Sequence, residues 1–309
     1  MQFVFLILLV FLLSPAAVVA QFRRHARIFR KLPLVLVIAV AALVIPNRTA
    51  AQILTPDRSL PVDLPANETP ETQLSASSPS SDRPVSWKLL YSNVIADQKH
   101  IWSFPARLRQ GQNWTPTAAV LAATAGLVLL DPTEARYFRR TPTFHGFNNI
   151  FNGTATAISM GATPASLYVI GLIRKDSKMQ HTALLAGEAM ADAELLTTVL
   201  KDATRRVKPG GFPASGNLND SWFEKRGSPA YSYLKGDGSF PSGHTIAAFS
   251  VATIIARRYR NHRWVPYAAY GLASVVGFSR LTLSVHFLSD VFMGGALGYS
   301  ISRFTVLRE

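Results

Sequence analysis

Apolar stretches of helical length dominate the chain from Trp87 onward. They cover residues 116–130, 154–173, 181–203, 244–260, 264–278 and 287–304. The pattern is mainly helical, and the sequence shows neither an alternating pattern of useful strand length nor an internal repeat. It therefore predicts an all-α fold, a helical bundle with about six core helices.

The lengths of these stretches leave open whether the bundle crosses a membrane. The uncharged parts of most of them are shorter than the roughly 20 residues that a bilayer span needs. Residues 110–130 come closest to that length. A bundle outside the membrane and a bundle with several short spans both fit this pattern.

Two apolar runs, residues 3–20 and 32–46, open the chain and flank a basic cluster. The cluster contains Arg23, Arg24, Arg27, Arg30 and Lys31. Because basic residues beside a membrane segment tend to stay in the cytoplasm, we expect the second run to lead outward. The same run also resembles a secretory signal, with small residues for cleavage in "NRTAAQ". We interpret residues 1–51 as membrane or signal segments that place the rest outside the cytoplasm, on the periplasmic or extracellular side.

Residues 52–85 are rich in Pro, Ser and Thr and contain few aromatic residues. Such a segment buries little apolar surface, so we predict a disordered linker that precedes one domain over residues 86–309. Inside this domain, residues 209–240 form a long irregular insert, and loops of that length are often functional. Its aromatic residues either cover an acyl or isoprenoid chain or pack as ordinary loop residues. They are Trp222, Phe223, Tyr231 and Tyr233.

The chain of 309 residues contains no cysteine and has a net charge of +14. The absence of cysteine excludes a disulfide scaffold and a cysteine-ligated metal site. The charge suits an anionic partner: nucleic acid, an anionic membrane surface or a phosphorylated substrate. Because a topogenic role explains the N-terminal basic cluster, we predict no nucleic-acid partner.

A histidine and an aspartate lie four residues apart in "SRLTLSVHFLSD", at His286 and Asp290. On a helix this spacing puts both side chains on one face. A carboxylate beside an imidazole can accept its N–H, which leaves the other ring nitrogen free as a base or nucleophile. Taken alone, the pair is weak evidence for a site and is more typical of ordinary surface or core packing.

The stretch "PSGH", Pro241 to His244, directly precedes an apolar helical run. Ser242 suits the N-cap position, and Gly243 would let a ligand approach the backbone closely. The free N–H groups of a helix start attract anions, and His244 would lie beside such an anion. Taken alone, the stretch is also a plain helix start with a chance histidine.

Three cations accompany these residues: Lys201 and Lys208 in "KDATRRVKP", and Arg280 in the third stretch. Cations brought close together favour an anion between them, although Lys201 and Lys208 could equally form a solvated basic helix end. Arg205 and Arg206 lie in the same stretch and carry the same charge.

In order and spacing, the three stretches together resemble the signature of the type 2 phosphatidic acid phosphatase superfamily. Its pattern is Lys-x6-Arg-Pro, then Pro-Ser-Gly-His, then Ser-Arg-x5-His-x3-Asp. The second and third parts match completely, and the first matches at Lys201 and Pro209. Lys208 stands where the pattern has Arg, so a compact point charge replaces a planar bidentate fork. The resemblance extends from about Lys201 to Asp290.

This resemblance implies a metal-independent phosphatase that needs no cofactor. It implies that His286 attacks phosphorus and forms a phosphohistidine, while Asp290 orients His286 and stabilises its positive charge. His244 would protonate the leaving oxygen and then activate water. The groups that would bind the phosphoryl oxygens are Lys201, Lys208, Arg280, Ser242 and the Gly243 amide.

The predicted function is a membrane-associated phosphomonoesterase or pyrophosphatase acting on a lipid phosphate or a related small phosphate ester. Two alternatives stay open. One is a vanadium-dependent haloperoxidase that uses the same site, with His286 as the vanadium ligand. The other is a non-catalytic lipid-binding membrane protein, which the presence of both histidines and Asp290 disfavours.

Overall fold

The computed structural model of the protein describes residues 83–224 and 236–309. These residues form helices and short helical turns and no strand, which confirms the predicted all-α class. The α-helices are α4 (Leu90–Trp102), α5 (Phe104–Arg109), α6 (Trp114–Arg140), α7 (His145–Ile150), α8 (Gly153–Ile173), α9 (Ser177–Thr204), α10 (Gly243–Arg258), α11 (Trp264–Thr282) and α12 (Leu288–Ser300). The turns are η2 (Pro209–Gly211), η3 (Leu218–Asp220) and η4 (Ile301–Val306), a π-helical turn that continues α12.

Several predictions concern residues outside this description. They are the N-terminal segments 1–51, the linker as far as residue 82, and two aromatic residues of the insert, Tyr231 and Tyr233.

The six predicted core helices correspond to α6 and to α8–α12. The main difference is in α6, which was expected to end at residue 130 and instead continues through Pro132 to Arg140. A proline inside a helix removes one backbone hydrogen bond. Tertiary contacts of the preceding Asp131, which is buried, hold the helix together at this point. The short helices α4, α5 and α7 were not predicted.

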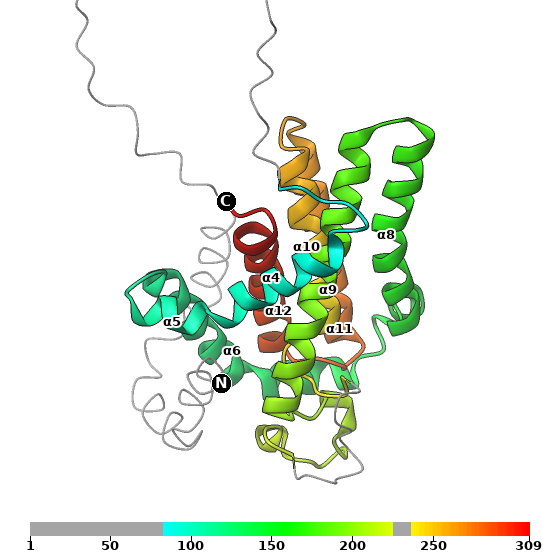
Figure 1. Cartoon of the computed structure of the whole chain (residues 1–309). Coiled ribbons are helices and arrows are strands. Elements are labelled where there is room, and N and C mark those ends of the chain that lie inside the picture. The colour runs from blue at the N-terminus through cyan, green and yellow to red at the C-terminus, as the bar shows by residue number, and fades with distance from the viewer. Residues whose placement is uncertain (1–82, 225–235) are drawn as a thin grey trace, which may run out of the picture. The chain divides into compact units, whose positions relative to one another are not determined.

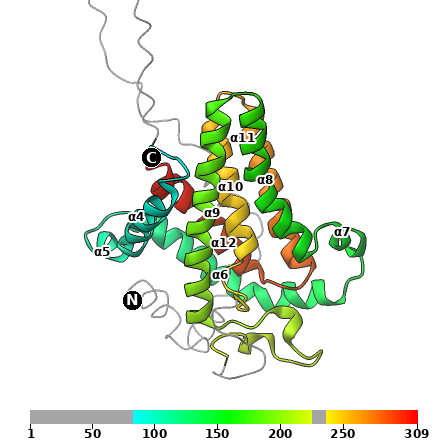
Figure 2. The same cartoon turned by 45° about the vertical axis from the view of Figure 1, so that its right-hand side comes forward.

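Helix α10 lies at the centre of the bundle and packs against α9, α11 and α12 (Figure 2). Its Ile246 and Ile254 are completely buried and belong to the main core cluster with Leu196 and Leu200 of α9. A side chain at Gly298 of α12 would overlap the Ile246 carbonyl oxygen, so glycine permits the close approach of α10 and α12. This packing brings the start of α10 beside the end of α9 and the start of α12.

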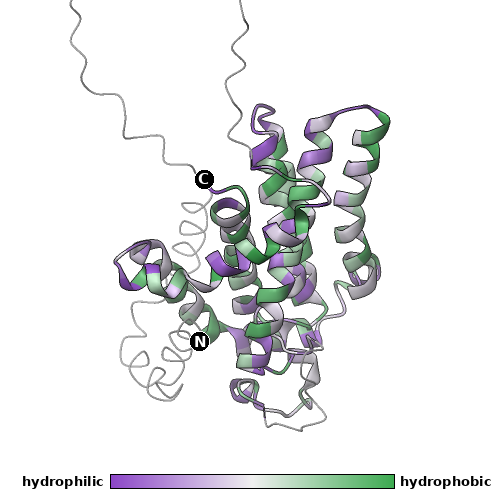
Figure 3. Ribbon diagram, viewed as in Figure 1, coloured by the Kyte–Doolittle hydropathy of each residue, from purple (hydrophilic) through white to green (hydrophobic). Residues whose placement is uncertain are grey.

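Helices α6 and α8 are long and apolar enough to cross a membrane, and only 17% of the best window of each is buried. Exposed apolar side chains on α8 include Ile158, Val169 and Ile173. Figure 3 colours parts of the α8 ribbon as hydrophobic. Helix α8 runs alongside α9, whereas α6 runs crosswise beneath α8–α11 and contacts α12 (Figures 1 and 2). The two apolar helices support association with a membrane, but their directions differ, so they cannot both follow the bilayer normal.

Helix α4 is anchored to α9 by a buried ion-pair cluster. Arg83 contacts Asp97 of α4 at 2.5 Å and Glu188 of α9 at 2.7 Å, and both carboxylates are fully buried. This cluster lies on the side of α9 that faces α4, and none of its residues belongs to the three sequence motifs.

Candidate active site

The structure brings the predicted site residues together where several helices end or begin. Lys201 lies near the end of α9, Ser242 to His244 begin α10, and Arg280 lies near the end of α11. His286 lies in the turn between α11 and α12. The motifs are separated by up to about ninety residues in the sequence but meet because α10 packs against α9, α11 and α12.

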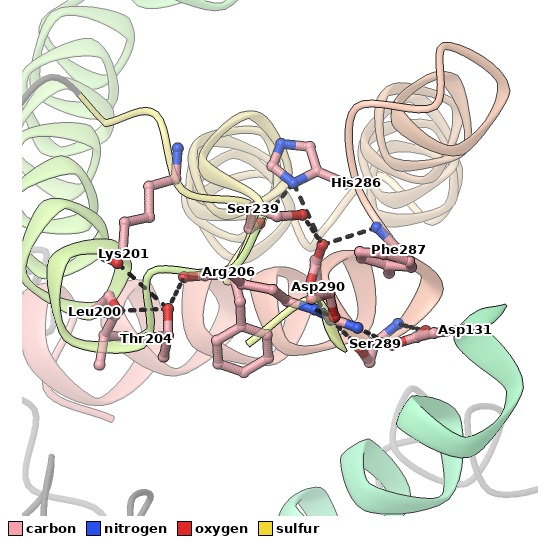
Figure 4. A network of polar contacts seen from close by, with 12 residues as sticks. Asp131, Leu200, Lys201, Thr204, Arg206, Ser239, His286, Phe287, Ser289 and Asp290 are labelled. Atoms are coloured by element: carbon pink, nitrogen blue, oxygen red, sulfur yellow. Dashed lines mark hydrogen bonds and ion pairs between the residues drawn. The ribbon is translucent and has the colours of Figure 1, made fainter. Parts of the chain in front are cut away.

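His286 is buried, with 4% of its surface exposed, and its ring is held through Nδ1. Nδ1 lies 2.7 Å from the backbone carbonyl oxygen of Ser239. Because a carbonyl only accepts, Nδ1 carries the hydrogen and the lone pair is on Nε2. Figure 4 shows the outer ring nitrogen and the Lys201 ammonium on the same side of the network, away from Asp290. Burial lowers the pKa of His286, which favours the neutral ring with its lone pair.

Asp290 is not on the same helical face as His286, because His286 precedes α12 and Asp290 lies in its first turn. Its Oδ2 lies 3.7 Å from His286 Nδ1, so the two form an ion-pair contact when the ring is charged. The same oxygen accepts hydrogen bonds from the Ser239 hydroxyl and from the Phe287 N–H, the latter at 2.8 Å. Ser239, which the sequence analysis did not single out, therefore contacts both members of the pair.

The Asp290 carboxylate is held in its ionised form. Burial alone would raise the pKa of Asp290, but the guanidinium of Arg206 and the hydrogen bonds to its oxygens hold that pKa below the usual value. A fixed negative charge therefore lies behind His286 and stabilises any positive charge that develops on the ring.

The start of α10 lies beside the Lys201 ammonium. Ser242 is the N-cap residue and is fully buried, although its hydroxyl accepts a 2.8 Å bond from Thr245 Oγ1 and does not cap the helix. A Cβ at Gly243 would lie 3.7 Å from Lys201 Nζ. An anion at this helix start would therefore meet free N–H groups and an ammonium together.

Contacts with the neighbouring backbone hold Lys201 in this position. Its Nζ donates a 2.8 Å bond to the Gly236 carbonyl oxygen, and a Cβ at Gly238 would lie 3.0 Å from Lys201 Cβ. Burial lowers the pKa of Lys201, and the positive charge of Lys208 lowers it further. Lys208 is thus near Lys201. Within residues 83–224 and 236–309, the Lys208 ammonium makes no hydrogen bond that would keep it from an anion.

Arg280 is also buried, and part of its guanidinium is occupied. Its Nη2 donates to the carbonyl oxygen of Phe151 and to Thr156 Oγ1, the latter at 2.9 Å, while Nε donates to Ser279 Oγ. Burial lowers the pKa of Arg280 to about 10, so it keeps its charge at neutral pH. The backbone carbonyl of Arg280 accepts the N–H of His286 at 3.3 Å, which connects Arg280 to the turn that holds His286.

His244 is half-buried in the first turn of α10. Its Nε2 lies 3.1 Å from the Gly153 carbonyl oxygen, so Nε2 carries a hydrogen and Nδ1 exchanges the second proton. Burial lowers the pKa of His244 to about 4, and the charges of Arg280, of Lys201 and of His286 when it is protonated add to this effect. The free site is therefore electropositive, and an anion would favour protonation of His244.

Within the described ranges, no group of three His, Cys, Asp or Glu side chains could hold a metal ion. Together these residues provide a buried imidazole with a carboxylate behind it, a second imidazole, several cations and a helix start. This arrangement is suited to the transfer of a phosphoryl group.

Comparison with known proteins bears on this arrangement. The model of the PAP2 superfamily, the type 2 phosphatidic acid phosphatases, matches residues 182–308 and thus includes all three motifs. The match identifies residues 182–308 as a region of the PAP2 superfamily.

Curated relatives match over shorter stretches. A lipid A 1-phosphatase of Porphyromonas gingivalis is 39% identical over 34% of this chain and 22% of the relative. A phosphatidylglycerophosphatase B of Bacillus subtilis is 34% identical over 34% of this chain and 46% of the relative. The chain thus spans less than half the length of either relative. A crystal structure of a transmembrane PAP2 type phosphatidylglycerolphosphate phosphatase from Bacillus subtilis has a TM-score of 0.36 at 21% identity, over 70% of this chain and 92% of that one.

Binding of sulfate to the candidate site is expected to draw a proton onto His244. A dianion offsets the surrounding positive charge and raises the pKa of His244 from about 4, so binding takes up protons and strengthens as the pH falls. Calorimetry in two buffers with different ionisation enthalpies measures this uptake. His244→Gln should still bind sulfate but take up no proton. Unchanged proton uptake in that variant would show that another group takes the proton.

Proposed function

We propose that the chain is a phosphomonoesterase that hydrolyses a phosphorylated lipid through a phosphohistidine. The observation that supports it most directly is His286, whose Nδ1–H is held by the Ser239 carbonyl so that the lone pair lies on Nε2. The membership of residues 182–308 in the PAP2 superfamily and the names of three relatives as phosphatases agree with this chemistry.

In the proposed first step, Nε2 of His286 attacks phosphorus and forms a P–N bond. The bond between phosphorus and the ester oxygen breaks, and that oxygen takes a proton from Nδ1 of His244 as it leaves. His286 gains a positive charge in this step, which Asp290 at 3.7 Å from Nδ1 stabilises.

In the second step, water replaces the histidine. His244, now neutral, accepts a proton from the water as the water oxygen attacks phosphorus. The P–N bond breaks, inorganic phosphate leaves, and His286 regains its lone pair. His244 therefore acts once as an acid and once as a base, and both imidazoles return to their starting states.

The phosphoryl oxygens would be bound by Lys201, Lys208, Arg280, Ser242 and the N–H of Gly243. These cations and the start of α10 supply the positive charge that stabilises the transferring group. Because side chains provide that charge, the proposed mechanism requires neither a metal nor a cofactor.

The proposed substrates are lipids that carry a phosphomonoester. Two relatives from Porphyromonas gingivalis are named for lipid A, and one from Bacillus subtilis is named for phosphatidylglycerophosphate. The apolar surfaces of α6 and α8 would bring the site to the lipid. Of the insert aromatics, Trp222 stacks on Arg206 at 4.1 Å, which favours the packing interpretation for that residue.

A screen for phosphate release tests this function. The substrates are phosphatidate, phosphatidylglycerophosphate, lipid A, an isoprenyl diphosphate and soluble phosphate esters, each with and without EDTA. We expect release from a lipid phosphate, no effect of EDTA, and inhibition by vanadate. Halide-dependent peroxide chemistry of vanadate-loaded protein without release from any phosphate ester would instead identify a haloperoxidase.

We further propose that the catalytic domain lies outside the cytoplasm, because the basic cluster Arg23 to Lys31 favours the cytoplasmic side. An alkaline phosphatase reporter fused after residue 85 is expected to be active in a bacterial host, and one fused near Arg30 inactive. The reverse pattern would place the site in the cytoplasm. A β-galactosidase reporter at the same two positions, which is active only in the cytoplasm, is the matched control.

A further inference from the structure

Arg206 is a buried guanidinium, 1% exposed, that lies between carboxylates of two helices. Nη1 donates to Asp290 Oδ1 of α12, and Nη2 donates to Asp131 Oδ2 of α6 at 2.6 Å (Figure 4). Its Cζ lies 4.1 Å from the centroid of the Trp222 ring and 3.9 Å from the centroid of the Phe287 ring. Because protein groups surround it, Arg206 is not available to bind phosphate. It joins α6 to the carboxylate behind the nucleophile.

Asp131 contacts the start of α12 through both of its carboxyl oxygens. Oδ1 accepts the Ser289 N–H at 3.0 Å, and Oδ2 accepts the Ser289 hydroxyl at 2.5 Å in addition to the Arg206 guanidinium. Burial and the charge of Asp290 oppose ionisation of Asp131, whereas Arg206 and the Ser289 hydroxyl favour it. Both oxygens only accept hydrogen bonds, and the helix start adds positive charge, so the contacts fit a carboxylate.

Arg206 also holds the other partner of His286. Its backbone carbonyl accepts the Ser239 N–H at 2.7 Å, and the Ser239 carbonyl in turn accepts Nδ1–H of His286. The side chain of Arg206 fixes Asp290, and its backbone fixes Ser239. Both protein contacts of the His286 ring nitrogen therefore depend on this one residue.

The negative charges in this network stabilise positive charge that develops on the His286 ring, against the effect of burial. Asp131 and Asp290 carry two negative charges and Arg206 carries one positive charge, so one negative charge is left to balance an imidazolium. Without Asp131, Arg206 would neutralise Asp290 and leave none. We infer that Asp131 and Arg206 are positioning residues for His286, with Asp131 preserving the charge of Asp290 and Arg206 fixing its geometry.

Other charged groups also act on His286. Asp290 of α12, Lys201 of α9 and His244 of α10 face it directly. Glu134 of α6 lies beside Asp131 and Asp290. None of these side chains is replaced in a variant of Asp131. Because the Asp131 charge also opposes ionisation of Glu134, a change in the titration of His286 reports the net loss of negative charge from this network.

The experiment compares Asp131→Asn, which removes the charge, with Asp131→Glu, which keeps it. We expect Asp131→Asn to lower the pKa of His286, measured by NMR of labelled imidazole in detergent without substrate. We also expect kcat to fall by about tenfold with KM unchanged, less than the roughly 10²-fold cost of losing a direct contact. Asp131→Glu should stay close to wild type in both measurements.

Two controls separate positioning from loss of fold. Ser289→Ala perturbs the same contacts without changing charge, so the pKa of His286 should stay near the wild-type value. Asp97→Asn removes a buried carboxylate at the distant Arg83 cluster, so it should reduce thermal stability and leave kcat unchanged. If Asp131→Asn does not fold, Arg206→Lys keeps the charge but cannot bridge two carboxylates, and it should lower kcat with KM unchanged.

This inference deepens the proposed function and rests on it for the kinetic part alone. A pKa of His286 that is unchanged in Asp131→Asn, in a protein that releases phosphate, would overturn the positioning role and leave the function intact. A lowered pKa in a protein that releases no phosphate from any lipid would overturn the function and support the charge coupling. If Asp131→Asn and Arg206→Lys both keep wild-type kcat, the positioning role is wrong.

Discussion

His286→Ala is expected to lower phosphate release by about 10³-fold or more, because the covalent step has no other nucleophile in place. The ring is buried and held by the Ser239 carbonyl with its lone pair on Nε2, and Asp290 lies 3.7 Å behind it. An alanine leaves the cations and the helix start intact, so substrate should still bind. Steady-state kinetics should therefore show a large loss of kcat with a small change in KM.

A matched control is His181→Ala, at an exposed position near the other end of α9 from Lys201, which should keep wild-type activity. Rapid quenching with ³²P-labelled lipid should trap an acid-labile, base-stable phosphoprotein in wild type and none in His286→Ala. Wild-type turnover by a folded His286→Ala protein would rule out the proposed nucleophile.

The sequence predicted the helices well where apolar periodicity was strong. Helices α8–α12 begin or end within a few residues of the predicted bounds because their apolar faces pack around α10. Helix α6 was predicted too short, since Asp131, Pro132 and the charged residues that follow are typical of a helix end. Local propensity could not foresee that a buried partner from a distant loop would hold Asp131 inside the helix.

The sequence motifs predicted those residues of the candidate site that lie within the motifs. Their order placed Lys201, His244 and His286 in one family pattern, and the structure brings them close enough for their charges to influence one another. The pattern also suggested that His286 and Asp290 share a helical face. In the structure, a turn before α12 holds His286, and Nδ1–H donates to a backbone carbonyl that no sequence motif marks.

Three partners of the site were missed: Ser239, Asp131 and the buried role of Arg206. Ser239 directly precedes the second motif but acts partly through its backbone, which carries no sequence signal. The sequence gives one indication of the role of Asp131. A carboxylate directly after an apolar helical run suggests a buried acid with a positively charged partner. The sequence could not identify that countercharge, because Arg205, Arg206 and Lys208 are equivalent by charge.

The structure distinguishes these three cations, which sharpens what Lys208 should do. Arg206 is occupied by Asp131 and Asp290, and Arg205 donates to the Glu224 carbonyl oxygen at 2.9 Å. Lys208 lies near Lys201, whose pKa its charge lowers. It also precedes Pro209 and Gly210, and the Gly210 N–H donates to the Ser284 carbonyl oxygen at 2.8 Å in the turn before His286. Of the three, Lys208 is therefore the cation we expect to reach the phosphate.

Lys208→Ala is expected to slow hydrolysis of the best substrate by about 10²-fold or more, the usual cost of removing one preorganised electrostatic contact to a developing charge. Lys208→Arg keeps the charge and restores the planar fork of the superfamily pattern, so its rate should equal or exceed that of wild type. Arg205→Ala removes the same formal charge from the same stretch of sequence. It should change the rate little, because the Arg205 guanidinium donates to the Glu224 carbonyl oxygen. Steady-state kinetics on the three variants test this assignment. If Lys208→Ala is as fast as wild type and Arg205→Ala is slow, Arg205 and not Lys208 contacts the phosphate.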